Sequence, residues 1–261
     1  MLDTLLDWDN LTLLFYIGMR MTGFVAFSPF FARSGVPMPF RSGVILMFTL
    51  VVWSAYDGPV PAPGSILELA VRLLLELLVG LVLNLVIRFF FYIPDQAGEL
   101  VDTQMGLSMA RSYDPGSQAS STVTANLLSQ MMLVLFFVCS GHVTLIRLVL
   151  DSGDLMPFGT AALGGRLADR CLTLFTECVL LAVKMGFPIL GAELMGQVGM
   201  GVLMKVIPQI NVFAINIELK VVIGLAMLSM MMGPISSYLL EAESYLLTQI
   251  KDLLWLMSQG G

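Results

Sequence analysis

Long apolar runs separated by short polar or turn-forming stretches dominate the chain. Several of these runs approach or exceed the roughly 20 residues with which an α-helix crosses a hydrocarbon core of about 30 Å. The pattern predicts six apolar helical segments, at about 11–31, 43–56, 66–93, 123–150, 166–190 and 212–240. We therefore expect an all-α integral membrane protein built from about six long, partly broken helical segments.

Prolines and glycines mark the expected ends of these segments. Pro94 is expected to end the third segment, and a separate helix is predicted over 96–109. A glycine-rich stretch, 191–207, follows the fifth segment, and the tail 241–257 has the apolar periodicity of an amphipathic helix. The second segment is short for a full span, so we expect a short helix packed against protein there.

Composition agrees with a membrane protein and narrows its chemistry. Of the 261 residues, 57% are hydrophobic and 12% charged, whereas soluble domains carry about 25% charged residues. The net charge of −6 and only 13 scattered Lys and Arg argue against a nucleic-acid partner. Three cysteines and one histidine give no disulfide framework and no metal spacing. No catalytic residue, metal site or cofactor is predicted, and an enzymatic role is unsupported.

Charges at the segment ends give a partial orientation. The first ten residues carry three aspartates and no basic residue, so they lack the positive region of a cleaved signal peptide, and the first segment is expected to remain. If this segment starts outside, the loop with Arg33 and Arg41 and the loop with Arg111 both lie in the cytoplasm. The N-terminus is therefore predicted to be periplasmic.

One loop breaks this charge rule. Three arginines flank a connection that six regular spans would place outside: Arg147, Arg166 and Arg170. Either the number of true spans differs from six, or several segments do not sit in lipid.

Charged residues also lie inside the apolar segments, where they are costly in lipid. Those with candidate roles are Arg20, Glu68, Arg72, Glu76 and Arg88. Glu68, Arg72 and Glu76 follow one another at i,i+4 spacing, share one helix face and can pair. The favoured interpretation is structural ion pairs within the chain or with neighbouring subunits, and the alternative is a proton relay.

Four separated motifs carry a family resemblance. The strongest is Gly98-Glu99-Leu100, followed by the run 102–108 and by Asp114-Pro115, and a second is the run 208–213. The residues that carry these two motifs are Gly98, Glu99, Gln104, Pro208, Gln209, Asn211, Phe213 and Lys220. Matches near the N-terminus include Arg20, Pro29 and Arg41, and Gly141-His142 forms the fourth. In this order and over essentially its whole length, the chain resembles the FliR family of bacterial flagellar type III export-gate subunits.

This resemblance implies a fold and partners. FliR-like chains form a single domain, here 1–261, in which 1–190 would be a FliP-like part and 191–261 a FliQ-like hairpin with a C-terminal amphipathic helix. The chain would assemble with FliP and FliQ, contact FlhB and membrane lipid, and help form a conduit for unfolded flagellar proteins. Its place would be the bacterial inner membrane, in the flagellar basal body. Charges in nominal spans would then face neighbours or a wet conduit rather than lipid.

The resemblance also implies that the segment 107–122 lies inside the conduit and helps to plug it. Glycine and proline provide hinge points in this segment, serine and threonine keep it polar, and methionine and tyrosine offer adaptable contacts for a seal. The candidate gate residues are Met105, Gly106, Leu107, Ser108, Met109, Ala110, Arg111, Ser112, Tyr113, Asp114 and Pro115. The alternative is a solvated cytoplasmic loop that only links two helices.

Two rival functions stay open from the sequence. The chain could be the equivalent subunit of a virulence injectisome, which uses a related export gate. A secondary transporter that uses the buried charges is the alternative from another class.

Overall fold

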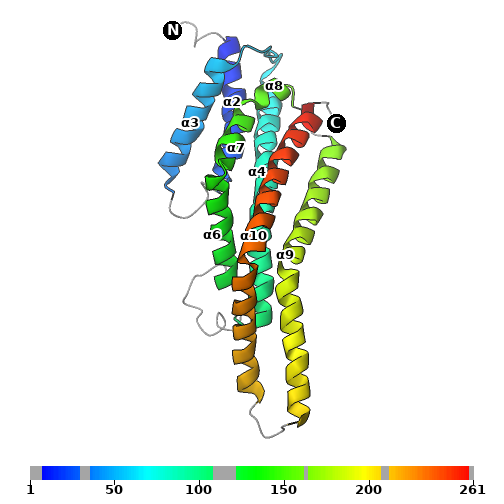
Figure 1. Ribbon diagram of the computed structural model, residues 1–261. Helices are drawn as coiled ribbons and strands as arrows, with labels where there is room; N and C mark the ends of the chain where they lie inside the picture. Colours follow the sequence, from blue (N-terminus) through cyan, green and yellow to red (C-terminus); the bar gives the residue numbers. More distant parts are fainter. Residues whose placement is uncertain (1–7, 30–35, 108–121, 162–163, 207–211, 259–261) are drawn as a thin grey trace. The chain divides into compact units, whose positions relative to one another are not determined.

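The computed structural model describes residues 8–29, 36–107, 122–161, 164–206 and 212–258 (Figure 1). All regular structure in these ranges is α-helical. The helices are α2 (Trp8–Ala26), α3 (Met38–Ala55), α4 (Ile66–Met105), α6 (Val123–Val138), α7 (Gly141–Leu150), α8 (Ser152–Leu155), α9 (Gly165–Val206) and α10 (Val212–Ser258). The predicted all-α fold is confirmed.

Three helices are longer than expected because they continue through a proline. Helix α4 has 40 residues and contains Pro94, α9 has 42 and contains Pro188, and α10 has 47 and contains Pro234. The predicted end at Pro94 and the separate helix over 96–109 were therefore wrong. A proline removes one backbone donor, and in apolar surroundings neighbouring groups re-satisfy the freed carbonyl, so a long apolar helix tolerates it.

The second and fourth segments also differ from expectation. Helix α3 begins at Met38 rather than near residue 43, because Pro39 is tolerated in a first helical turn; the helix thereby reaches 18 residues. The fourth segment is broken, since Ser140 adopts a left-handed conformation with φ of 60° and α6 and α7 meet at a bend of 69°.

Four helices of the described residues are long and apolar enough to cross a membrane. They are α3, α4, α9 and the part of α10 from Glu218, and the bent pair of α6 and α7 would make a fifth span. The expected six segments thus correspond to four or five candidate spans.

The chain divides into two compact units. Unit 1 consists of 1–90, 140–175 and 244–261, and unit 2 of 91–139 and 176–243. Helices α4, α9 and α10 each contribute residues to both units. The division at residue 190 into a FliP-like and a FliQ-like part stays a prediction.

In unit 1, two glycines bring α2 and α4 into backbone contact. A Cβ added to Gly23 would lie 2.3 Å from the Leu77 carbonyl oxygen, and one added to Gly80 would lie 2.2 Å from the Arg20 carbonyl oxygen. Neither position has room for a side chain, so the helices pack as closely as their backbones allow. This crossing places Arg20 of α2 beside Glu76, one turn before Gly80 on α4.

Unit 2 contains an antiparallel helical hairpin made by α9 and α10. The Tyr238 hydroxyl donates to the Leu181 carbonyl at 3.2 Å, and a Cβ on Gly196 would lie 2.6 Å from Ile223. From Leu181 to Gly196 along α9, the contacting residue of α10 falls from Tyr238 to Ile223, so the two helices run antiparallel. The core of unit 2 lies where this hairpin meets α4 and α6; it consists of Ala97, Val101, Met105, Leu128, Met132, Met185, Ile189, Leu228, Ile235 and Leu239.

Candidate functional site

Unit 1 contains a buried ion pair between Arg20 and Glu76. Arg20 Nε lies 2.7 Å from Glu76 Oε2, and both side chains are fully buried. The pair and its partners from the segment after α7 are named the charge cluster here: Arg20, Glu76, Ser152, Met156, Phe158 and Gly159. An ion pair without solvent is stable only when its remaining donors and acceptors are also satisfied.

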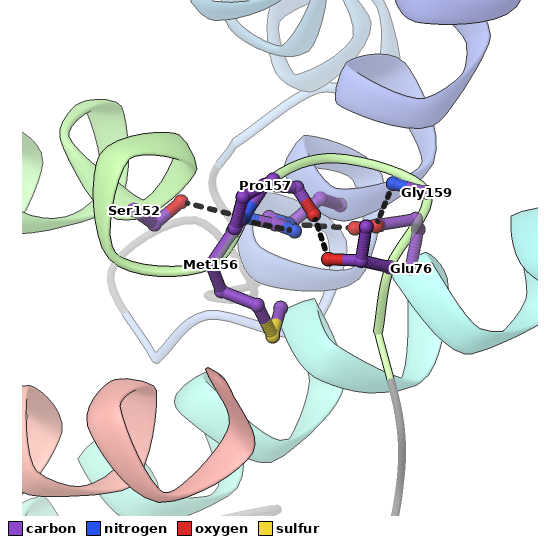
Figure 2. Close-up of polar contacts among 7 residues, drawn as sticks. Glu76, Ser152, Met156, Pro157 and Gly159 are labelled. Carbon is purple, nitrogen blue, oxygen red and sulfur yellow. Dashed lines mark hydrogen bonds and ion pairs between the residues drawn. The ribbon is translucent and has the colours of Figure 1, made fainter. Parts of the chain in front are cut away.

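The segment 152–159 supplies those remaining partners (Figure 2). The guanidinium donates to Ser152 Oγ at 3.1 Å and, from both terminal nitrogens, to the Met156 carbonyl at 3.2 Å. The Gly159 backbone N–H donates to Glu76 Oε1 at 2.8 Å. Both carboxylate oxygens are thus engaged, which favours a structural ion pair over a proton relay.

Two aromatic rings and a glycine complete this junction. The Phe158 ring centre lies 4.2 Å from Arg20 Cζ, a cation–π contact, and the Tyr56 ring meets Phe158 edge-on at 5.0 Å. Burial raises the pKa of the Tyr56 hydroxyl. Gly159 has φ of +81°, and a Cβ there would lie 2.8 Å from the Tyr16 ring, so only glycine fits.

The other charges inside α4 have local partners. Arg72 lies 2.5 Å from Glu68 at i,i+4 spacing and also donates to the Pro61 carbonyl at 3.1 Å. Glu76 faces Arg20 instead of Arg72. Arg88 donates from Nε to the Phe27 carbonyl at 3.0 Å. The sequence therefore pointed to the charged residues but not to Ser152, Met156 or Gly159, whose only signal is a turn-forming Pro-Phe-Gly run.

In unit 2, Asp102 joins the end of α4 to the start of α6. Its carboxylate is fully buried and accepts from the Thr124 backbone N–H at 2.8 Å and from the Thr124 hydroxyl at 2.5 Å. Thr124 lies in the first turn of α6, where backbone N–H groups lack helical partners and negative charge is favoured. Asp102 thus acts as an N-terminal cap from another helix.

Gly106 ends α4 by a Schellman turn. Its φ is +80°, its N–H donates to the Thr103 carbonyl at 3.2 Å, and the Leu107 N–H donates to the Asp102 carbonyl at 3.0 Å. These bonds satisfy carbonyls that a helix end otherwise leaves free. Asp102 therefore takes part in both the turn that ends α4 and the cap that starts α6.

Close packing of small residues holds α4 and α6 together at this point. A Cβ on Gly98 would lie 2.3 Å from Ala125 Cα. Gly98 lies one turn before Asp102 on α4, and Ala125 follows Thr124 on α6. We name Gly98, Asp102, Gly106, Thr124 and Ala125 the loop anchor, because they fix both ends of the connection 107–122. Met105 is fully buried in the same unit, and its side chain contacts Gly224.

Several residues singled out from the sequence lie outside the described residues. These are Ser108, Met109, Ala110, Arg111, Ser112, Tyr113, Asp114, Pro115, Pro208, Gln209 and Asn211. Phe213 belongs to α10, and Lys220 lies on the same helix, partly buried, as are Glu99 and Gln104 on α4. Within the described ranges, no three His, Cys, Asp or Glu side chains come close enough to hold a metal ion.

These features define a polytopic helical membrane protein with internally paired charges and an anchored connecting loop. The family model described as "Bacterial export proteins, family 1" matches residues 11–244, so the chain belongs to this family of bacterial export proteins. The family resemblance of the sequence is thereby confirmed, and the chain is a transport component of an export apparatus rather than an enzyme.

Similar proteins include flagellar biosynthetic proteins and a Yersinia translocation protein. The chain is 27% identical to "Flagellar biosynthetic protein FliR" of Escherichia coli (strain K12), over 95% of this chain and 94% of that protein. It is 24% identical to the Bacillus subtilis (strain 168) protein of the same name, over 98% and 99%. It is also 24% identical to "Yop proteins translocation protein T" of Yersinia pestis, over 69% of this chain and 70% of that protein.

Proposed function

We propose that this chain is a structural channel subunit of a flagellar type III export gate, assembled with FliP and FliQ and in contact with FlhB. In this assembly it helps to form the conduit for unfolded flagellar proteins, and its segment 107–122 plugs that conduit. Its location is the bacterial inner membrane, within the flagellar basal body.

The loop anchor is the observation that carries the plug proposal. A polar segment that only linked two helices would need no fixed ends, because long surface loops cost little to close. Here a buried carboxylate, Asp102, caps α6 at Thr124, and a left-handed Gly106 turns the chain out of α4. A plug must stay in one place, so fixed ends on either side of the segment support the proposal.

Exposed apolar side chains support assembly with other subunits and contact with lipid. The last part of α9 presents several large hydrophobic residues at its surface: Leu194, Met195, Val198, Val202, Leu203, Met204 and Val206. Such a surface needs a cover of lipid or protein. Together with the antiparallel partner in α10, this hairpin is the part that we compare with FliQ, and 1–190 is the part that we compare with FliP.

Deleting 108–112 tests the plug. The variant is co-expressed with FliP and FliQ, and the membrane permeability to small ions and metabolites is measured in cells. We expect a leak, because the polar segment no longer fills the conduit. A matched control replaces the same five residues by a Gly/Ser run of equal length, which keeps the span of the loop but removes its side chains; it separates loop length from sealing contacts.

Assembly must be measured in the same cells. If FliP and FliQ co-purify with the deletion variant as with wild type and permeability stays unchanged, the plug proposal fails. If the wild-type chain brings down neither partner, the proposal of an export-gate subunit fails instead.

The injectisome is a second candidate, because the chain is also similar to a Yersinia translocation protein. The flagellar assignment is supported by the larger share of the chain that aligns with the Escherichia coli flagellar protein, 95% against 69% for the Yersinia protein. Deleting the gene in its own organism should abolish flagella and motility. Loss of effector secretion with motility intact would favour the injectisome.

For orientation we propose a periplasmic N-terminus and a cytoplasmic segment 107–122. This orientation requires α2 to cross the membrane in addition to the candidate spans α3 and α4. The end of α4 then lies opposite the N-terminus, as the cytoplasmic arginine loops require. Labelling of single cysteines by a membrane-impermeant reagent from each side distinguishes the two orientations.

A further inference from the structure

A shallow groove of about 260 Å³ lies in unit 1, separate from the charge cluster. It is lined by Phe27, just after α2, and by residues of α4 that include Leu78, Leu81, Asn84, Leu85 and Arg88. The residues of α4 recur every three or four positions, so they form one stripe along the helix. Phe27, Leu78 and Leu85 are 51%, 41% and 40% exposed, so the groove opens to the outside of this unit.

Arg88 is the cation at one end of this stripe. Its Nε donates to the Phe27 carbonyl, and it forms no ion pair with any described residue. A guanidinium has five N–H groups, so the four on its terminal nitrogens remain for another partner. Arg88 is exposed on a helix of membrane-spanning length and composition, so an anionic group at this position gives the guanidinium the ion pair that it lacks.

Asn84 lies one turn before Arg88 and is also incompletely satisfied. The side chain is 2% exposed, and its Oδ1 has no hydrogen-bond partner among the described residues. A buried carboxamide oxygen without a hydrogen-bond donor costs about 1–3 kcal/mol. Because four residues rise about 6 Å along a helix, the two polar groups are spaced to meet two polar groups of one elongated ligand.

We propose that this groove binds an anionic glycerophospholipid. The phosphate lies on the Arg88 guanidinium, the glycerol region meets Asn84, and one acyl chain follows Leu85, Leu81 and Leu78. The groove is smaller than the roughly 300–1,000 Å³ of pockets that enclose whole ligands, so it holds a chain and leaves the headgroup outside. Ile66 and Arg88 are separated by about 33 Å of helix, close to the thickness of a hydrocarbon core. If Ile66 lies at one boundary of the hydrocarbon core, Arg88 therefore lies at the opposite boundary, where the headgroup layer begins.

The lining of the groove favours a lipid chain as its occupant. It is apolar along Leu78, Leu81 and Leu85 and carries a cation, Arg88, at one end. A single acyl chain matches the apolar stripe, and its phosphate supplies the negative charge that Arg88 lacks.

Native mass spectrometry of the chain co-purified with its FliP and FliQ partners tests this. The probes are phosphatidylglycerol and phosphatidylcholine with identical acyl chains, added in equal amounts to the detergent-solubilised complex. We expect about tenfold more phosphatidylglycerol than phosphatidylcholine bound. Arg88→Gln should reduce the ratio to near one, and Arg88→Lys should keep part of it, because the charge remains and the planar fork is lost.

Two further variants keep the result interpretable. Arg166→Gln removes an exposed arginine elsewhere in unit 1 and should leave the lipid ratio unchanged. Leu81→Trp fills the groove while Arg88 stays, and should lower the binding of both lipids. Equal binding of the two lipids by wild type, an unchanged ratio in Arg88→Gln, or a purified complex that binds neither lipid would each overturn the proposal. The last result would mean that a partner chain covers the groove.

Discussion

Replacing Glu76 by Gln probes the charge cluster most directly. The substitution keeps the size of the side chain but removes the charge opposite Arg20, which is fully buried with its only ion-pair partner among the described residues. Gln can still accept one hydrogen bond, from Arg20 or from the Gly159 N–H. Its amide group then places a donor where the second carboxylate oxygen accepted, so one buried donor loses its acceptor.

The expected loss of stability is about 3–5 kcal/mol. This is the usual cost of leaving one member of a buried ion pair without its partner. A loss of this size approaches the whole stability of many domains. The partly exposed pair of Glu68 and Arg72 provides the matched control, since breaking an exposed pair costs at most about 1 kcal/mol. Glu68→Gln should therefore have a small effect.

Unfolding of the purified chain in mixed detergent micelles, followed by tryptophan fluorescence, measures both free energies. A double-mutant cycle with Arg20→Met and Glu76→Met isolates the interaction itself. We expect the double variant to be more stable than the sum of the single losses predicts, by at least about 2 kcal/mol, because it leaves no isolated buried charge.

Two results would contradict this reasoning. The first is a Glu76→Gln loss no larger than that of Glu68→Gln. The second is a coupling below about 0.5 kcal/mol in the cycle, which is the additivity of unconnected sites.

The loop anchor gives three further predictions, all measured as changes in unfolding free energy with limited proteolysis of 107–122 as a second readout. Asp102→Asn keeps an acceptor at the start of α6 but loses the charge, so we expect a loss of about 1 kcal/mol and faster cleavage; unchanged cleavage would argue against the anchoring role. Gly106→Ala should cost about 1–2 kcal/mol through its left-handed backbone alone, because a Cβ there meets no other atom; no loss would contradict the Schellman turn. Gly98→Ala places a Cβ 2.3 Å from Ala125 Cα and should cost at least about 1–3 kcal/mol. The control Gly191→Ala places a Cβ in open space and should be neutral or stabilising. Equal effects of the two variants would contradict the close packing of α4 against α6.

The helical segments could be predicted because composition and the length of the apolar runs show which stretches must be buried. The ends of the helices could not be predicted in this way. Pro94 has the local signal of a helix end, yet α4 continues through it, since the cost of one lost hydrogen bond is small beside the packing of 40 residues. Conversely, the break at Ser140 has no proline, and a left-handed serine is chosen by its surroundings rather than by its own preference.

The candidate sites show the same limit. The Glu68–Arg72 pair follows from i,i+4 spacing, which is a local property. The partner of Glu76 lies 56 residues away on α2, and the crossing that joins them depends on Gly23 and Gly80. A single sequence contains these glycines but does not say which helices they bring together. Asp102 was visible only as part of a family motif, whereas its role as a cap needs the position of α6.

The wide spacing of the charge cluster along the chain has a consequence for synthesis. Arg20 leaves the ribosome 56 residues before Glu76 and 132 residues before Ser152. At about 5–20 residues per second, roughly 7 to 26 s pass before Ser152 is made, and Met156, Phe158 and Gly159 follow it. Until Glu76 is made the guanidinium has none of its final partners, and until 152–159 is made it has Glu76 alone, while lipid would be a poor solvent for it. Insertion of α2 into its final place is therefore a late event, completed only after more than half of the polypeptide has been made.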